Sequence, residues 1–419
     1  MRLKKIIQVF EHEKLTLHDG RGLTQKHLDV LITYNDKFNS EYFTVIRDGI
    51  KFSQFVGVIQ AGNLTIEILP KADKKEEVLE TSKAVWHNVL LDMLKECRYL
   101  KVNDVDKALL NLKSNSLLEI YIQLFLKETE QLLQEGLLKK YRKMQGNQLA
   151  LKGQLQFAKN ISQNLVHQER FYVRYTVYNH NNIFNQLLYK TIILIPLISN
   201  NPWIADKVNR LLLNFPEPSD IKVSTEVFKN IVFGRKTERY REAMLISKML
   251  LLNFRPDITG GPENVIAILF DMNKLWEEFV YRRLKKEELQ VNISVLRQQS
   301  KDFWQPEGLL SKKIRPDIIL KELDKTIVID TKWKSYNLTP ADDDLKQMFV
   351  YNLYWKCDRS VLLYPASTAN SSFGSYHHHD ECADPERQCA IETVSVLNES
   401  QNGLNKSFGK NILKTILHY

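Results

Sequence analysis

The sequence is poor in several features that mark specialised classes of protein. Its four cysteines, Cys97, Cys357, Cys382 and Cys389, are too few and too scattered for a disulfide framework, which favours a reducing cytoplasm. No apolar run approaches the roughly 20 residues that a membrane span needs. The basic start MRLKKIIQVFEHEK loses its apolar run too soon for a secretory signal. We therefore expect a soluble, cytoplasmic protein.

Two further absences narrow the classes that remain. No P-loop of the form G-x-x-x-x-G-K-[ST] is present, which argues against nucleotide hydrolysis by the chain itself. No internal repeat is evident, and a charged fraction of 26% gives no sign of global disorder. The net charge of +9 has two interpretations that composition leaves open: solubility, or attraction of a polyanionic partner.

Residues 1–75 are predicted to be β-rich. Between Phe43 and Lys71, three strand-like runs are separated by Asp48-Gly49 and by Ala61-Gly62-Asn63. Such glycine-containing turns between alternating apolar runs are typical of hairpins. A short helix, residues 24–33, is expected to precede them.

Residues 76–255 are predicted to be mainly helical, because their apolar residues recur at helical spacing. Ser116 is the candidate N-cap of a strongly apolar helix that stops at Gly136. The basic stretch KKYRKMQGNQ (139–148) is expected to be a solvated turn, with a phosphate contact as the alternative.

Residues 256–419 are predicted to form a third part, beginning around the break at Gly260-Gly261-Pro262. The order helix, strand, strand, helix, strand is an α/β order with a mixed sheet, so the chain as a whole is expected to be α+β and multidomain. The segment SYHHHDECADPERQC (375–389) has the residue types of a zinc site, but its cysteine spacing fits no common finger. We expect a solvated loop there.

Two short β-branched runs in IRPDIILKELDKTIVIDTKWK (314–334) each carry an aspartate. Asp317 precedes the first run, and Asp330 ends the second. Side chains alternate along a strand, so Asp330 and Lys332 share one face. A hairpin that closes within 321–325 sets Asp317 beside Asp330 or close to Lys332, depending on its register.

Two carboxylates that meet in this way repel each other unless a divalent cation lies between them. Mg²⁺ suits the position, because it prefers oxygen ligands and retains water. Lys332 could orient or help deprotonate an attacking water, or stabilise charge on a scissile phosphate. Pro316-Asp317 followed by Asp330-Thr331-Lys332 is the pattern of the PD-(D/E)xK nucleases. Taken alone, it competes with a surface hairpin that carries ordinary ion pairs.

Two neighbouring helices add to the pattern. In LWEEFVYRRL, Glu277 and Glu278 flank an apolar stripe, and one of them could turn a third carboxylate toward the metal; the alternative is a solvated helix face. In DLKQMFVYNLYW, Gln347 and Tyr351 lie four residues apart, on one helical face. This Q-x-x-x-Y spacing looks like the RecB-type branch of these nucleases. Gln347 would contact nucleic acid or the active site, unless both residues merely flank the core.

Over most of residues 40–365 the chain resembles McrC, the endonuclease subunit of McrBC-type modified-cytosine restriction systems. Three blocks occur in family order: VGVIQAGNLTIEILPK; LKGQLQFAKNISQNLVHQERFYVRYTVYNHNNIFNQLL; and FDMNKLWEEFV followed by IRPDIIL and VIDTKWK. The resemblance implies that residues 1–75 dock on an McrB-like AAA+ GTPase ring and stimulate it, and that residues 256–419 form a Mg²⁺-dependent nuclease domain that cuts double-stranded DNA.

By motif position, the resemblance implies three ligands of the metal, namely Asp317, Asp330 and Glu277. It implies a catalytic set of Asp317, Asp330, Lys332, Glu277, Gln347 and Tyr351. Recognition of the modified base would belong to the ring. Two rival hypotheses remain: a non-catalytic adaptor that docks on an AAA+ motor and binds DNA, and a nuclease of a different defence or repair assembly. A neighbouring AAA+ GTPase gene would favour the restriction hypothesis.

Overall fold

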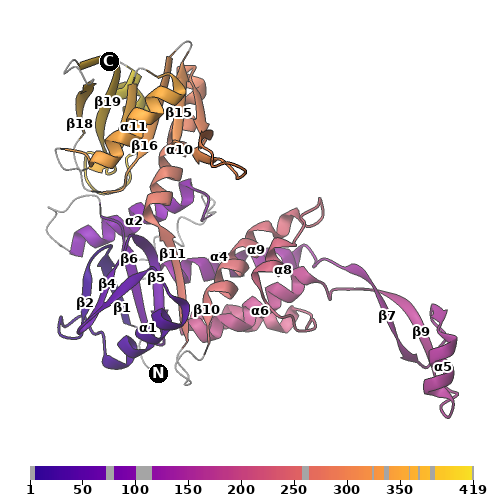
Figure 1. The fold of residues 1–419 in the computed structure, drawn as a ribbon. Helices are drawn as coiled ribbons and strands as arrows, with labels where there is room; N and C mark the ends of the chain where they lie inside the picture. The colour runs from indigo at the N-terminus through magenta and orange to yellow at the C-terminus, as the bar shows by residue number, and fades with distance from the viewer. Residues whose placement is uncertain are drawn as a thin grey trace. The chain divides into compact units, whose positions relative to one another are not determined.

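The computed structural model shows a mixed α+β chain with several sheets (Figure 1). It describes residues 5–71, 80–100, 116–256, 264–322, 325–334, 339–357, 359–366, 369–377 and 383–417. These residues form two compact units. One holds the elements from α4 to β10, the other holds most of the N-terminal elements and those from α10 onward, and β5 and β11 are divided between them. No helix within the described ranges is long and apolar enough to cross a membrane.

The N-terminal region is β-rich, and its predicted helix is confirmed. Thr24 caps α1 by accepting a hydrogen bond from the backbone N–H of His27. The three predicted strand runs become four strands, because the chain also breaks at Ser53 and Gln54, where no glycine marks a turn. β1 pairs in parallel with β6, and β4 pairs with β2 and β3. The elements are β1 (Lys5–Phe10), β2 (Lys14–Thr16), α1 (Gln25–Phe38), β3 (Phe43–Ile46), β4 (Gly49–Phe52), β5 (Phe55–Ala61), β6 (Leu64–Leu69) and α2 (Glu80–Glu96).

The helices of the other unit follow the predicted apolar spacing. Ser116 caps α4 by accepting from the backbone N–H of Glu119, and Gly136 follows the helix end with a φ of +87°. The prediction of a helix between these two residues is confirmed. The elements are α4 (Leu117–Gln134), α6 (Ile183–Ile198), α7 (Pro202–Asn214), α8 (Thr225–Lys229), η2 (Glu238–Tyr240), α9 (Arg241–Asn253) and β10 (Phe254–Arg255).

The predicted turn at 139–148 is wrong. This stretch forms β7 (Lys140–Gln148), which pairs antiparallel with β9 (Phe171–Asn179) along its whole length. β8 (Gln154–Leu155) and α5 (Phe157–Asn164) lie at the far end of this ribbon (Figure 1). Most of β7 is exposed, so it lacks the apolar alternation by which a half-buried strand is predicted.

A six-stranded mixed sheet carries the aspartates, and the predicted mixed sheet is confirmed. Its order is β12 (Ser294–Arg297), β15 (Ile318–Glu322), β16 (Lys325–Thr331), β17 (Arg359–Ala366), β19 (Ala383–Ser395) and β18 (Asn370–His377). β16, β17 and β19 run parallel, and the other pairs are antiparallel. The loop expected at 375–389 is wrong where the structure describes it, because both ends of that segment are strand; residues 378–382 lie outside the described residues.

Helices cover this sheet. From α11 (Asp342–Trp355), the side chains of Met348 and Tyr351 pack on Ile319, Val328 and Leu362 of the strands. α10 (Met272–Val291) and α12 (Phe408–Leu417) contact each other and the strands β16 and β19. β11 (Val265–Asp271) leads into α10, and a small hairpin of β13 (Lys301–Trp304) and β14 (Lys312–Ile314) stands beside the sheet.

The close approach of α12 to α10 gives a test of this packing. A Cβ added at Gly409 would lie 2.5 Å from the carbonyl oxygen of Arg283, whereas one at Gly403 meets nothing closer than 4.0 Å. We expect Gly409→Ala to cost about 1–3 kcal/mol of stability, because backbone cannot yield as a flexible side chain does. Gly403→Ala is the matched control. Equal melting temperatures of the two variants in a thermal scan would contradict this packing.

Candidate active site

The strand pairing brings the two predicted aspartates to the same end of the hairpin. The last residue pair between β15 and β16 is Ile318 with Ile329. Asp317 and Asp330 are the next residues of the two chain segments, so they lie opposite each other just beyond this pair. Asp317 Oδ2 accepts two hydrogen bonds from Thr331, one from the backbone N–H and one from Oγ1, both at 2.8 Å. Of the two registers left open by the sequence, the structure has the one with Asp317 beside Asp330.

Asp330 and Lys332 form the ion pair at the centre of the site. Lys332 Nζ lies 2.7 Å from Asp330 Oδ2, as expected for side chains on one face of a strand. Asp330 is only 3% exposed. Burial and the nearby Asp317 carboxylate raise the pKa of Asp330 to about 6, although Lys332 opposes the shift.

Asp344, at the start of α11, is a member of the site that the sequence did not reveal. Its Oδ1 lies 3.3 Å from Lys332 Nζ, and its Oδ2 pairs with Lys334. Burial acts to lower the pKa of Lys332, but the carboxylates of Asp330 and Asp344 outweigh it and raise that pKa. Lys332 is therefore held as an ammonium ion between two carboxylates.

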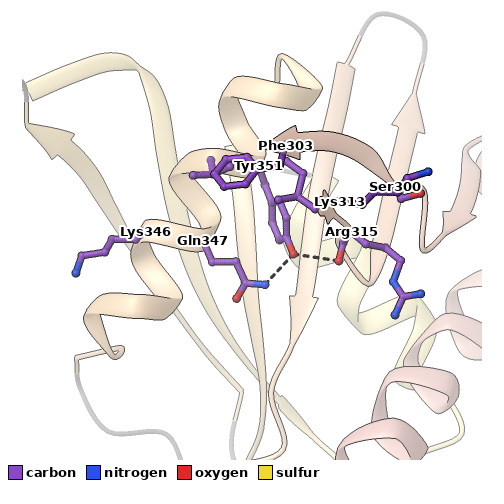
Figure 2. Close-up of a pocket in the computed structure, with 9 residues that line it drawn as sticks. Ser300, Phe303, Lys313, Arg315, Lys346, Gln347 and Tyr351 are labelled. Atoms are coloured by element: carbon purple, nitrogen blue, oxygen red, sulfur yellow. Dashed lines mark hydrogen bonds between the residues drawn. The ribbon is translucent and has the colours of Figure 1, made fainter. Parts of the chain in front are cut away.

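Gln347 and Tyr351 join the site to an adjoining cleft. Gln347 Oε1 accepts from Lys332 Nζ at 3.3 Å, and its Nε2 donates to Asp330 Oδ1 at 3.4 Å and to the Tyr351 hydroxyl at 2.7 Å. Tyr351 in turn donates to the backbone carbonyl of Arg315 at 3.0 Å (Figure 2). Both side chains line a cleft of about 670 Å³. The predicted shared helical face thus points to the aspartates, with Tyr351 also packing in the core.

The structure separates the two candidate glutamates on α10. Glu278 pairs with Arg282 and Arg297 and is buried. Glu277 accepts from the side chain of Gln298 and lies 3.8 Å from Arg297, yet burial together with the charge of Asp317 raises its pKa. Glu277 therefore lies within the electrostatic field of the aspartates, whereas Glu278 is more closely paired, with two arginines.

A second contact that the sequence did not reveal lies next to Lys332. Trp333 Nε1 donates to Glu11 Oε1 at 2.6 Å, and the Trp333 ring meets that of Trp276 at 5.2 Å between centroids. Burial raises the pKa of Glu11 to about 7. Trp276 precedes Glu277, so these rings lie beside two of the predicted catalytic residues. No sequence pattern marks this contact, since it joins residues 322 positions apart.

The carboxylates of the site do not meet in a ready-made metal-ligand cluster. Among the described residues, no three His, Cys, Asp or Glu side chains are arranged to hold a metal ion. Asp330 is nevertheless buried, and its ion pair with Lys332 at 2.7 Å leaves the pKa of the carboxyl raised. Asp317 and Asp330 still repel each other electrostatically. A buried carboxylate whose charge is only partly compensated suits a cation that prefers oxygen ligands.

The pKa of Asp330 leads to a test of stability against pH. The native pKa near 6 lies above the ordinary aspartate value of 3.8, so ionising Asp330 costs more in the folded chain than in the unfolded one. As the pH rises from about 4 to about 6, wild type should therefore become less stable, whereas Asp330→Asn should not. In metal-free buffer at pH 8 we expect the variant to melt about 2–6 °C higher, with little difference at pH 4.

Asp343→Asn is the control for this measurement, because Asp343 is exposed on the same helix turn as Asp344 and pairs only loosely with Lys346. It should leave the melting temperature unchanged at both pH values. If Asp330→Asn destabilised the protein equally at pH 4 and pH 8, the proposed repulsion at this carboxylate would be wrong.

Comparison with known proteins assigns the chain to a family. The family model described as McrBC 5-methylcytosine restriction system component matches residues 50–365. The type IV methyl-directed restriction enzyme EcoKMcrBC of Escherichia coli (strain K12) is 22% identical over 225 residues. That alignment covers 52% of this chain and 65% of the relative, which is less than two thirds of its length.

Two solved structures share the fold. One is a chain of the refined half-complex from a tetradecameric assembly of Thermococcus gammatolerans McrB AAA+ hexamers with bound McrC; it has a TM-score of 0.72 at 22% identity, with 99% of both chains covered. The other, from the Thermococcus gammatolerans McrBC complex, has a TM-score of 0.53 at 24% identity, with 67% of this chain and 88% of that chain covered. Since the family match extends over well more than half of its residues, this chain belongs to the McrBC 5-methylcytosine restriction system component family.

Proposed function

We propose that this chain is the Mg²⁺-dependent DNA endonuclease subunit of a GTP-driven, McrBC-like restriction complex. In this proposal the six-stranded sheet with α10 and α11 is a PD-(D/E)xK nuclease domain. The chain works with an McrB-like AAA+ ring, stimulates its GTPase and hydrolyses phosphodiester bonds of double-stranded DNA. The alternative is a non-catalytic adaptor that docks on the ring and binds DNA.

One observation supports the proposal above the others. Asp317, just before β15, and Asp330, near the end of β16, lie side by side at one end of these neighbouring strands, and the Lys332 ammonium lies 2.7 Å from Asp330 beside an open cleft. A surface hairpin with ordinary ion pairs would leave such carboxylates solvated. Here Asp330 is buried with its pKa raised, which is typical of functional sites.

The residues of the site suit complementary roles in phosphodiester hydrolysis. Lys332, held as an ammonium, supplies positive charge for the scissile phosphate, so we favour this role over that of a general base. Gln347 fixes the positions of Lys332 and Asp330 through its side-chain amide, whose oxygen accepts from Lys332 and whose nitrogen donates to Asp330. Tyr351 orients Gln347 and closes one side of the cleft.

The donor set suits Mg²⁺. Asp330, buried with its charge only partly compensated by Lys332, and Asp317 would hold the ion, and Glu277 is the third carboxylate within their field. A bound Mg²⁺ would supply Lewis acidity and lower the pKa of a coordinated water. The protein side chains have separate roles. They position the phosphate, balance charge and exclude bulk water.

The family and the solved relatives support the partner. The matching solved chains come from McrB–McrC assemblies, and the curated relative is a methyl-directed restriction enzyme. The sequence has no P-loop, so GTP hydrolysis in this proposal belongs to the ring. Readout of the modified cytosine is likewise assigned to the ring.

The nuclease proposal is tested by DNA cleavage with the cognate ring, GTP and Mg²⁺. We expect Asp330→Ala and Lys332→Ala each to slow cleavage by at least about a hundredfold, because the first removes a proposed ligand of the metal ion and the second removes the positive charge beside the scissile phosphate. Stimulation of the ring GTPase should persist, which shows that the variants still assemble. Asp343→Ala, an exposed neighbour, should cut like wild type. Undiminished cutting by Asp330→Ala would exclude the assignment.

Metal binding separates the nuclease from the adaptor without measuring activity. We expect MgCl₂ to raise the melting temperature of wild type and of Asp343→Asn, because a ligand that binds only the folded state stabilises it. The shift should disappear in the double variant Asp317→Asn, Asp330→Asn. A wild type that shows no shift at any Mg²⁺ concentration would favour the adaptor.

A further inference from the structure

The cleft beside the catalytic residues has walls from two elements outside the motif. One wall is α11, with Gln347 and Tyr351, and the other is the β13–β14 hairpin (Figure 2). Its volume of about 670 Å³ lies within the range of ligand pockets, about 300–1,000 Å³. It is therefore large enough for a nucleotide of one strand but not for a duplex.

The charge of the lining selects an anionic occupant. Among the described residues that line the cleft, three are cationic and none is a carboxylate; the cations are Lys313, Arg315 and Lys346. Lys313 and Lys346 have only loose, exposed ion pairs, at 3.9 Å and 3.8 Å, which contribute little. Arg315 is exposed, and its positive charge reaches Glu277. Three cations within one cleft form an electrostatic footprint for phosphates.

The apolar part of the lining suits a base. Phe303 borders the cleft and is 48% exposed, although its ring also contacts that of Tyr354 at 5.8 Å. Elsewhere on the hairpin and its loop, Trp304, Leu309 and Leu310 are also exposed. Aromatic faces flanked by basic side chains are the usual platform for a single strand, because every base can stack on them.

The hairpin is fixed in place by α11. Lys301 donates to the carbonyl of Tyr354 at the end of that helix and lies 5.0 Å above the ring of Trp355. The cleft is also connected to the catalytic centre through a chain of hydrogen bonds: Lys332 donates to Gln347, Gln347 to the Tyr351 hydroxyl, and that hydroxyl to the Arg315 carbonyl. A nucleotide held there would adjoin the phosphate at Lys332.

We propose that this cleft binds the DNA strand next to the scissile phosphate, with Lys313, Arg315 and Lys346 on backbone phosphates and Phe303 stacked on an unpaired base. The inference rests on the proposed nuclease function and names how that site holds its substrate. It assigns to the β13–β14 hairpin a positioning role that the PD-(D/E)xK motif does not include.

The test measures DNA binding by the full chain in an Asp330→Asn background, by fluorescence anisotropy with labelled duplex and single-stranded oligonucleotides and no divalent ion. The cleft variant combines Lys313→Ala, Arg315→Ala and Lys346→Ala. The control variant combines Lys321→Ala, Lys325→Ala and Lys410→Ala, which removes the same charge from exposed positions outside the cleft lining.

We expect the slope of log K against log salt to become shallower by about 1 for each cleft cation removed, and to stay unchanged in the control. Phe303→Ala should weaken single-strand binding roughly tenfold, Phe303→Tyr should restore it, and Phe303→Leu should not, because only a ring stacks on a base. Equal slopes for the cleft and control variants would overturn the proposal. The proposal would also be overturned if the cleft variant still bound DNA but no longer bound the ring, because the cleft would then hold an acidic segment of the partner.

Cleavage by the complex separates this proposal from the nuclease assignment. In the Asp330→Asn background, DNA binding by the cleft is measured independently of whether the wild-type chain cuts DNA. If wild type never cuts DNA but the cleft variant loses binding, the nuclease assignment fails and the cleft stands. If wild type cuts and the cleft variant, with Asp330 restored, cuts and binds like the control, the cleft proposal alone fails.

Discussion

The ion pair of Asp330 and Lys332 is the interaction on which the rest of the site depends. A carboxylate that is 3% exposed has lost most of its hydration, and such a loss costs several kcal/mol unless a partner offsets it. Lys332, two residues farther along the strand, is that partner at 2.7 Å. The compensation is incomplete, because the pKa of Asp330 still lies near 6. The strand thus holds a carboxylate that a further cation would stabilise, which a purely structural ion pair would not need.

The surrounding elements distribute the other charges around this pair. Asp317 is held by Thr331, Glu277 by Gln298, and Asp344 by Lys334, so each acid has a partner of its own. These partners come from β16, from the residue after β12, and from the chain beyond β16. Gln347 then joins the amine to the central carboxylate from α11. The position of a charged group in this site is therefore set by the packing of several elements, not by one strand.

That dependence explains which parts of the site could be predicted from the sequence. Strand alternation placed Asp330 and Lys332 on one face, and helical spacing placed Gln347 with Tyr351, because both rules act within one element. Asp344 could not be told apart from Asp342 and Asp343, since only the docking of α11 decides which of the three faces Lys332. The fold shows the same limit. Apolar helices such as α4 were predictable from Ser116 to Gly136, whereas the exposed strand β7 was not, because its partner β9 lies more than twenty residues away and buries little of it.

The acidic side chains of the site repel DNA, and the neighbouring cleft offsets this repulsion with positive charge. Four carboxylates gathered at one edge of a sheet repel a DNA backbone, and at physiological salt this repulsion reaches about 8 Å, far enough to act on any phosphate that approaches Lys332. The cleft next to them has the opposite charge, because its described lining includes Lys313, Arg315 and Lys346 but no acid. An adaptor that only bound DNA would gain from the cations and lose from the acids. Acids at the centre with cations around them are an arrangement that weakens plain binding but serves hydrolysis, because the acids can hold a metal ion while the cations hold the strand. The pairing of the two opposite fields, more than either motif residue alone, is what favours a nuclease over a DNA-binding module.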